Sequence, residues 1–429
     1  MINHGSIGIY KVMKQEENIY YHTFPSGLRM VYRKVASPVA YIGIMVGAGT
    51  RDELADEQGM AHFVEHCVFK GTEHRSSRQI INRIEAIGGE MNAYTTKEET
   101  TYYAAAPVAY SSRVLELLAD MLFCPIFPKD EIHKERQVIY DEIESYNDSP
   151  SELIYDDFEA IVFDGHSLAN PILGTKKSLR YFTADKAKRF MNRTYRPDRM
   201  VVFAESNRPF DKFVAETDKY VEKLAISRRE VAVLSIERTS PVILPDASES
   251  RCFRKHTHQA HVMLGGRAYP IAHERYLGLY LLNNIIGGGA MNSLLNMQLR
   301  EQKGLVYTVE SIYTPLSDTG YWSVYFACDP ADKEQCLSLV NRQLDQLMEK
   351  PFSEAFLRRA KRQLRGQLAI SAENRENNAL SMAKMMLYCN KAAQWEETMT
   401  HIAKLNPADL QKVAAEVFAP ANRYCLQYC

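Results

Sequence analysis

Residues 59–69 read Gly59-Met-Ala-His-Phe-Val-Glu-His-Cys-Val-Phe69, a run that no proline interrupts and that is predicted to form a helix. A helix turns by about 100° per residue, so with His62 set at zero, Glu65 lies at about −60° and His66 at about +40°. The three side chains therefore share one face of the helix within about one turn.

This face carries the residue types of a metal site. Imidazole nitrogens are suitable ligands for Zn²⁺, and histidines at positions i and i+4 can bind one ion together. A glutamate beside them is placed to take a proton from a zinc-bound water rather than to bind the metal. The order is H-x-x-E-H, the reverse of H-E-x-x-H. The alternative is a helix with two hydrogen-bonded histidines and a surface glutamate, so a third ligand is needed to decide.

A candidate for that ligand lies in residues 129–147, which also have helical spacing. With Ile139 of the apolar stripe at zero, Glu135 lies at about −40° and Glu142 at about −60°, on the side of the stripe. A carboxylate on a buried face is costly unless a cation meets it. Taken alone, both glutamates are best explained as a charged rim. With two histidines upstream, a carboxylate that faces zinc is the better interpretation.

The whole pattern resembles the pitrilysin-type (M16) zinc peptidases, and the similarity covers nearly all of the chain. In that family the third ligand is a downstream glutamate at the spacing of Glu142, and a second glutamate, which would be Glu135, supports the site. Further stretches that resemble the family are Phe24-Pro-Ser-Gly-Leu-Arg-Met-Val31, Phe69-Lys-Gly-Thr72, Gly88-Gly-Glu-Met-Asn-Ala-Tyr-Thr95, Glu99-Thr-Thr-Tyr-Tyr103 and Leu299-Arg-Glu-Gln-Lys-Gly-Leu-Val-Tyr307.

The resemblance implies a zinc endopeptidase that acts on unfolded peptides in a closed chamber. One Zn²⁺ would be bound by His62, His66 and Glu142, with water in the fourth position, and Glu65 would act as general base on that water. The predicted substrate strand, which adds a peptide to a sheet edge, is Asn92, Ala93, Tyr94 and Thr95. An ordinary internal strand is the alternative for these four residues.

Arg300 and Tyr307 resemble an Arg/Tyr pair with which the family binds substrate and stabilises the oxyanion from the half opposite the zinc. Otherwise they would be an arginine that ends a helix and a tyrosine in a strand. Because this chain carries both the zinc motif and the pair, the resemblance implies a homodimer in which each subunit completes the other's site. A heterodimer with a related zinc-free subunit is the alternative, and so are a processing-type role and a non-catalytic scaffold role.

Composition limits the other classes of function. The chain has 429 residues, 46% hydrophobic and 24% charged, which is typical of a globular protein with more than one domain. A formal net charge of −1 argues against a nucleic-acid binder, and no apolar run has the length of a membrane span. The segment Met1–Lys11 lacks the pattern of a signal peptide, and the eight cysteines form no C-x-x-C pair. We therefore expect a cytoplasmic protein with free thiols.

The order of predicted elements indicates an α+β fold with two tandem homologous α/β sandwich domains, each a mostly antiparallel sheet packed with helices. The domains are predicted at 1–226, which carries the zinc motif, and at 252–429, with a polar linker at 227–251. A helix is expected from Ser353 to about Asn390. The second copy has apolar residues where the first has its histidines, so one zinc per chain is expected.

Overall fold

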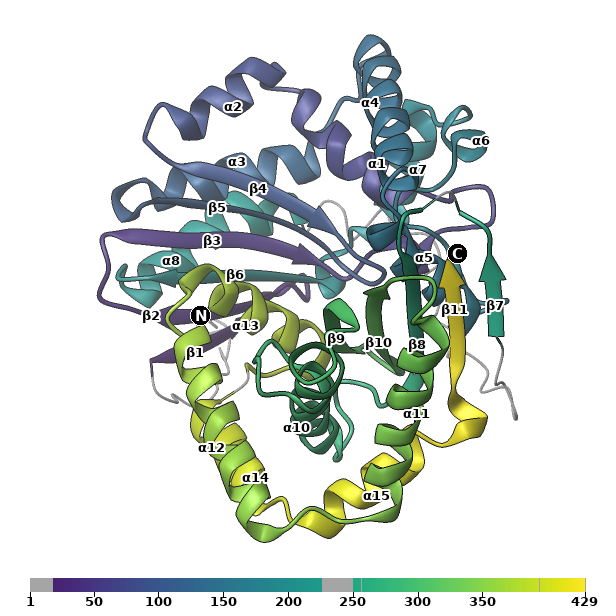
Figure 1. The fold of residues 1–429 in the computed structure, drawn as a ribbon. Coiled ribbons are helices and arrows are strands. Elements are labelled where there is room, and N and C mark those ends of the chain that lie inside the picture. The colour runs from purple at the N-terminus through teal and green to yellow at the C-terminus, as the bar shows by residue number, and fades with distance from the viewer. Residues whose placement is uncertain (1–17, 226–249, 256, 393, 429) are drawn as a thin grey trace, which may run out of the picture.

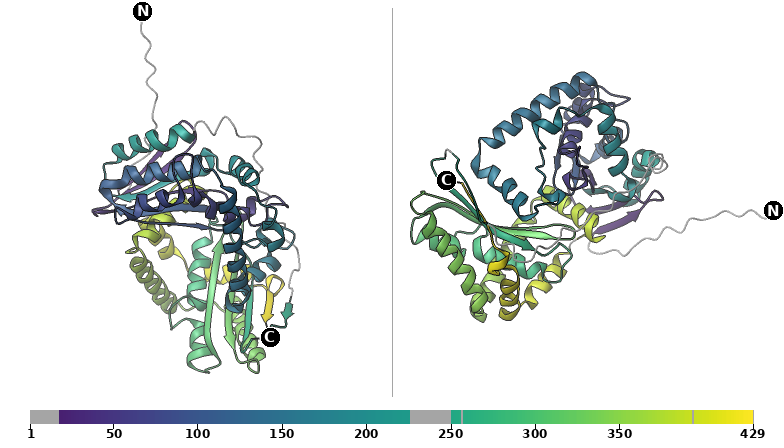
Figure 2. Two further views of the ribbon diagram at one scale, coloured as in Figure 1. Left: turned by 90° about the horizontal axis from the view of Figure 1, so that it is seen from above. Right: turned by 90° about the vertical axis from the view of Figure 1, so that its right-hand side faces the viewer.

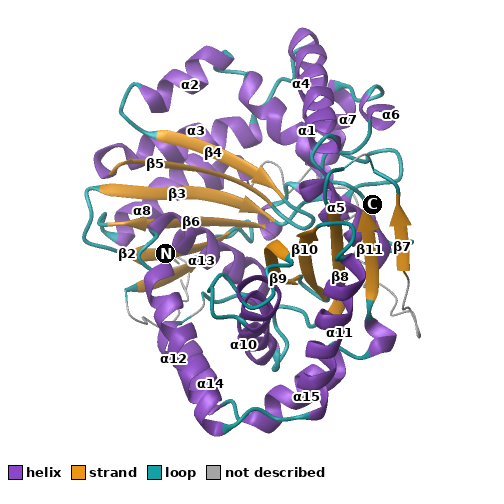
Figure 3. Ribbon diagram, in the orientation of Figure 1, coloured by secondary structure: helices purple, strands orange, loops and turns teal. Residues whose placement is uncertain are grey.

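The structure is a computed structural model that describes residues 18–225, 250–255, 257–392 and 394–428. The chain folds into two β-sheets that lie side by side, each packed with helices (Figures 1 and 3). The first half of the chain builds one sheet and the second half the other, and the halves stay distinct in two further views (Figure 2). The segment Met1–Lys11 lies outside the described residues. So does the predicted linker, apart from its last two residues, which begin a strand.

The first sheet has six strands. In spatial order they are β1 (Ile19–Thr23), β2 (Arg29–Lys34), β6 (Met200–Ser206), β3 (Val39–Val46), β5 (Thr100–Pro107) and β4 (Glu90–Thr95). Every neighbouring pair is antiparallel except β2 and β6. Side chains of a strand alternate between its faces. In β6, Val202 and Ala204 therefore join the core under the helices of this half, while Val201 and Phe203 pack on the opposite face.

The helices of this half mostly cover one face of the first sheet. They are α1 (Met60–Cys67), α2 (Ser77–Glu85), α3 (Ser111–Phe123), α4 (Lys129–Asn147), α5 (Pro150–Val162), α6 (Lys176–Leu179), α7 (Ala184–Thr194) and α8 (Phe210–Thr217). Helix α1 lies between α4, α7 and strand β4, so the motif helix is packed from several sides. This packing fixes the direction in which its histidines point.

The second sheet has five strands, in the order β7 (Ser250–Phe253), β11 (Tyr424–Tyr428), β8 (Ala260–Ala268), β10 (Gly320–Cys328) and β9 (Val306–Pro315). Of the neighbouring strands described in this sheet, only β7 and β11 run parallel. The helices of this half are α10 (Tyr276–Gly287), α11 (Lys333–Glu349), α12 (Glu354–Ser371), α13 (Arg375–Cys389), α14 (Trp395–Lys404) and α15 (Pro407–Val417). Trp322, Val324 and Phe326 of β10 form the centre of the core beneath them.

Two helices cross between the halves. Helix α5 belongs to the first half but packs on the second sheet, where Phe158 meets Tyr321 and Leu426. Helix α13 belongs to the second half but covers the free face of the first sheet, where Met382 and Ala383 form one cluster with β3, β5 and β6 (Figure 1). Each sheet is therefore buried on its second face by a helix from the other half.

The expected fold of two tandem, mostly antiparallel sandwiches is confirmed. The single helix expected from Ser353 to about Asn390 is wrong, because α12 ends at Ser371 and α13 begins at Arg375. Asn374 caps α13 by accepting a hydrogen bond from the backbone N–H of Asn377, which lets the chain turn from one sheet to the other. No helix in the described part of the chain has the length and apolarity that a membrane crossing requires.

Candidate metal centre and active site

The start of α1 is held by a carboxylate from the preceding loop. Gly59 adopts a left-handed conformation with φ 90°, and a Cβ there would lie 2.7 Å from the Cα of Gly174. The side chain of Glu53 accepts hydrogen bonds from the backbone N–H groups of Gly59 and Ala61, both at 2.9 Å. Burial raises the pKa of Glu53, and these two bonds oppose that shift. Glu53 thus satisfies N–H groups that the helix itself leaves unpaired.

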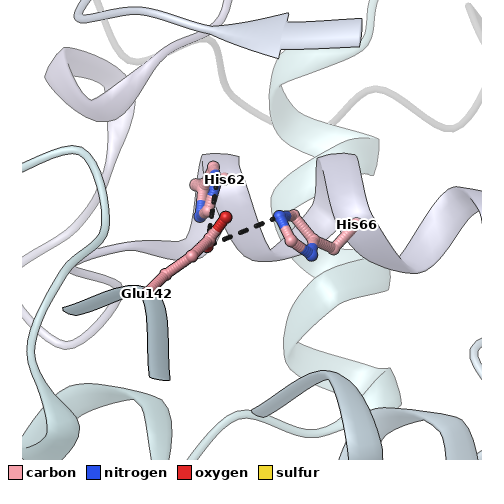
Figure 4. A group of neighbouring side chains, drawn as sticks. All are labelled: His62, His66 and Glu142. Atoms are coloured by element: carbon pink, nitrogen blue, oxygen red, sulfur yellow. Dashed lines mark ion pairs between the residues drawn. The ribbon is translucent and has the colours of Figure 1, made fainter. Parts of the chain in front are cut away.

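Helices α1 and α4 bring the three predicted zinc ligands together. The rings of His62 and His66 lie side by side with centroids 4.5 Å apart. Glu142 Oε2 lies 3.8 Å from His62 Nε2 and 3.8 Å from His66 Nε2 (Figure 4). One ligand atom from each of the three residues falls within 4.8 Å of the others.

This donor set fits Zn²⁺. Bond lengths of about 2.0–2.2 Å in a tetrahedral site separate neighbouring ligand atoms by about 3.3 Å, and the two separations from Glu142, each 3.8 Å, are close to this value. Burial, and then the charge of His66, lowers the pKa of His62 to about 3, so this imidazole is neutral as a ligand must be. His66 is buried too, which alone would lower its pKa. Its hydrogen bond with Glu135 and the nearby carboxylates Glu142 and Glu65 outweigh burial and raise that pKa.

Glu135 lies behind His66 and not among the three ligands. Its Oε2 is 3.1 Å from His66 Nδ1, and its Oε1 pairs with Lys70 Nζ at 2.7 Å. An ionised carboxylate only accepts, so Nδ1 carries the proton and Nε2 keeps its lone pair for a metal. Lys70 was not among the predicted site residues, although its position four residues after His66 could have suggested it.

Glu65 points from the same helix toward strand β4. Its Oε2 accepts a hydrogen bond of 2.6 Å from Thr95 Oγ1. Burial raises the pKa of Glu65, while the hydrogen bond from Thr95 and the charge of His66 oppose the rise and Glu142 adds to it. A carboxylate whose pKa is raised takes up a proton more readily than a free glutamate, as a general base beside a metal site must.

The predicted substrate strand is β4, which lies at the edge of the first sheet and, of the strands that the structure describes, pairs only with β5. The backbone N–H of Ala93 donates to Asn92 Oδ1 at 2.9 Å, and Tyr94 packs toward α13. Thr95 uses its hydroxyl on Glu65. The free edge of β4 is suited to an added strand, since an edge presents unpaired backbone groups.

Arg300 and Tyr307 are not brought to this site within one chain. Arg300 lies in a π-helical turn at Asn296–Glu301, and the ion pair of its guanidinium is with the adjacent Glu301 at 3.9 Å. Tyr307, in β9, is 82% exposed. Neither has an ion pair or hydrogen bond with the three predicted zinc ligands in the described part of the chain.

A second group of possible metal donors, His74, Asp120 and Cys124, also lies within 4.8 Å. Asp120 already accepts hydrogen bonds from Thr72 at 2.7 Å, His74 at 2.6 Å and Arg75 at 2.5 Å. Because Arg75 supplies the positive charge, this carboxylate needs no cation. We infer no metal there.

Two sandwich domains with an H-x-x-E-H helix and a distant glutamate define a protein of the zinc-peptidase class. A family model described as Insulinase (Peptidase family M16) matches residues 29–176, and one described as Peptidase M16 inactive domain matches residues 181–364. A Bacillus subtilis protein named as an uncharacterized zinc protease is 31% identical over 399 residues, or 92% of this chain and 95% of that protein. The chain belongs to the M16 zinc protease family.

Other comparisons agree. An uncharacterized zinc protease of Streptomyces coelicolor is 32% identical over 396 residues, which are 92% of this chain and 86% of that protein. A protease from Helicobacter pylori has a TM-score of 0.86 at 21% identity, covering 96% of this chain and 99% of that one. A peptidase M16 inactive domain from Pseudomonas fluorescens has a TM-score of 0.85 at 18% identity, covering 96% and 98%. At these identities the two structures establish the fold.

Proposed function

We propose that this protein is a zinc-dependent endopeptidase that hydrolyses unfolded peptides or protein segments. The observation that carries the proposal is the meeting of Glu142, on α4, with His62 and His66, on α1. A solvent-exposed glutamate has no structural need to lie beside the buried imidazole of His62 and the half-buried imidazole of His66. A divalent cation would explain all three positions.

In this proposal the zinc is held by His62, His66 and Glu142. When bound, Zn²⁺ supplies a Lewis acid that polarises the peptide carbonyl and makes water a stronger acid. Glu65 takes the proton of the attacking water and passes it to the leaving amine. Glu135 keeps His66 in the tautomer that can bind the metal.

The substrate binds as a strand added to the edge of β4. Backbone groups of Asn92 to Thr95 form its hydrogen bonds, which gives affinity with little sequence preference. Asn92 Oδ1 must release the N–H of Ala93 before that group can bind a peptide carbonyl, because this hydrogen bond occupies it. A homodimer closes the chamber, and Arg300 and Tyr307 of the second copy contact the substrate. A heterodimer with a zinc-free relative would serve the same purpose.

The direct test is the variant Glu65→Gln, assayed for zinc content and for cleavage of a quenched peptide. We expect zinc near one per chain and turnover lower by about 10²–10⁴-fold, because the general base is lost and the ligands remain. The matched control is Asp141→Asn on α4, since Asp141 is exposed and hydrogen-bonded to Gln137. It should change neither property.

Near-normal turnover by Glu65→Gln would remove that residue from its role. A wild-type chain that binds zinc but cleaves nothing would instead be a non-catalytic scaffold subunit. If the wild-type chain does cleave peptides, a cleavage-site profile on a peptide library would separate a processing role from a degradative one.

A further inference from the structure

The turn that follows the substrate strand contains three consecutive charged residues, all buried. Lys97, Glu98 and Glu99 are 6%, 1% and 2% exposed. Charged side chains in a turn between two strands are ordinarily in water, because burial of a charge is costly without a partner. Each of these three has a partner, and each partner comes from a different part of the molecule.

Lys97 binds the helix that crosses to the second sheet. Its Nζ lies 2.9 Å from Glu159 Oε2 of α5 and donates to the backbone carbonyl of Asn170 at 2.6 Å. Glu159 also accepts a hydrogen bond of 2.6 Å from Tyr321 of β10. The lysine is thus tied to the second sheet through one intermediate side chain.

Glu98 binds the hairpin between β9 and β10 directly. Its carboxylate accepts hydrogen bonds from the backbone N–H and the hydroxyl of Ser317, at 2.8 and 2.6 Å. Arg51 lies between the two halves, 2.6 Å from Glu98 Oε1 and 2.7 and 2.6 Å from the two oxygens of Asp318. This buried guanidinium joins carboxylates from both halves of the chain.

Glu99 binds the other crossing helix. One of its oxygens lies 2.9 Å from Lys384 Nζ of α13, and the other accepts a hydrogen bond from the hydroxyl of Tyr388. The turn is therefore fastened to α5, to the β9–β10 hairpin and to α13. All three contacts depend on how the two halves are packed.

Thr95, which holds Glu65, immediately precedes this turn. We propose that the turn Thr96–Glu99 positions Glu65 for catalysis, so that the packing between the two halves determines where the carboxylate stands. This proposal rests on the proposed function, in which Glu65 is the general base. Among the described strands, β4 lies at the edge of its sheet and has a neighbour on one side only, so its end needs another means of support. The three buried contacts supply it.

The alternative is that these contacts only hold the two halves together. Two variants separate the explanations. Arg51 pairs with two carboxylates, those of Glu98 and Asp318. Asp318→Asn, in the second half, removes the charge of one of them. Arg375→Gln removes another charged contact between the halves, from α13 to the buried Glu205 of β6, which does not involve the turn. Both should lower the midpoint of thermal unfolding, and both should keep zinc near one per chain.

Only Asp318→Asn should affect the site. We expect its kcat to fall by about tenfold with KM changed less than about twofold, because a small displacement of a catalytic group is costly. Hydrogen–deuterium exchange in residues 90–96 should become faster in Asp318→Asn and stay unchanged in Arg375→Gln. Ser317→Ala, which removes one hydrogen bond to Glu98, gives a milder form of the same result if Asp318→Asn fails to fold.

A double-variant cycle shows whether Asp318 acts through Thr95. Thr95→Val should lower kcat, and Thr95→Ser, which keeps the hydroxyl, should restore most of it. If both residues act on Glu65 along one path, Thr95→Val with Asp318→Asn will be no slower than the slower single variant.

Three outcomes overturn the proposal. The first is a double variant whose loss of kcat equals the product of the two single losses. The others are an unchanged kcat in Asp318→Asn, or the same rate of hydrogen–deuterium exchange in residues 90–96 in Asp318→Asn and Arg375→Gln. A wild-type chain without turnover would overturn the proposed function instead. The exchange comparison would still decide whether the turn fixes β4.

Discussion

At the scale of single residues, the candidate metal site depends on the pair His66 and Glu135. The carboxylate holds the proton on Nδ1, and Lys70 holds the carboxylate in turn, at 2.7 Å. The sequence placed Glu135 on the same side of α4 as Glu142. A helical wheel gives the direction in which a side chain points but not the residue that it contacts. The distance of Glu135 from the two candidate ligand histidines therefore could not be predicted.

Glu135→Gln should weaken zinc binding by about 10–100-fold, because the amide cannot hold the imidazole in its ligand tautomer as strongly. Competition with a chromophoric chelator measures this affinity. The control is Glu131→Gln on the same helix, since Glu131 pairs with the exposed Lys134 at 2.7 Å. Equal zinc affinity in the two variants would contradict the role given to Glu135.

Asp156 of α5 is a residue whose charge costs stability. Burial raises its pKa to about 6, Lys97 opposes the rise, and Glu159 and Asp157 add to it. Because the pKa of this acid is higher in the folded state than in the unfolded state, its ionisation destabilises the folded state. This loss of stability develops as the pH rises from about 4 to about 6. Asp156→Asn removes that cost.

Above about pH 7, we expect Asp156→Asn to raise the free energy of unfolding by about 1–2 kcal/mol. This is less than the free energy that corresponds to the whole pKa shift, because the carboxyl is partly open to solvent. The gain should shrink toward about pH 4, where the carboxyl is neutral in both states. Thermal unfolding at several pH values measures it. Asp148→Asn, an exposed carboxylate after α4, serves as control. Destabilisation by Asp156→Asn at every pH would show that the carboxylate is needed.

Among the elements, the motif helix was predicted from its sequence but its support was not. The spacing of His62, Glu65 and His66 is a local property, and α1 has it. Glu53 lies six residues before the helix-capping Gly59, and no local capping rule covers that distance. Likewise, α13 breaks away from α12 to pack on the sheet of the other half. The helical periodicity of the sequence does not indicate this long-range contact.

Glu53→Gln tests the support of α1. The amide would place an N–H group next to the backbone donors of Gly59 and Ala61, so the free energy of unfolding should fall by about 1–3 kcal/mol. Zinc affinity should fall as well, because both histidines stand on this helix. Ser76→Ala at the N-cap of α2 is the control, costing about 1 kcal/mol without an effect on zinc. Unchanged zinc affinity in Glu53→Gln would mean that the helix start and the metal site are independent.

At the level of the whole molecule, the sequence predicted two similar sandwiches but not that they exchange helices. The second faces of the sheets are closed by α5 and α13, each from the other half. The continuous apolar run Met200–Ala204 in β6 indicates that both faces of this strand are buried, but it does not indicate which helix covers each face. The exchange ties the halves into one body. Under the proposed function, Arg300 and Tyr307 would act from a second copy of the chain.

A complementation experiment tests that arrangement. Glu65→Gln and Tyr307→Phe chains should each be poor enzymes alone, but in a mixed dimer the intact Glu65 of one chain meets the intact Tyr307 of the other. After subunit exchange about half of the dimers are mixed, each with one good site of two, so activity should recover to about a quarter of the wild-type value. Native mass establishes the dimer.

Glu65→Gln mixed with Glu142→Gln is the control and should recover no activity, because in every mixed dimer each site has one of the two substitutions in its zinc-binding half. A monomer that cleaves peptide at full rate, or a dimer without recovery, would show that Tyr307 does not serve the partner's site.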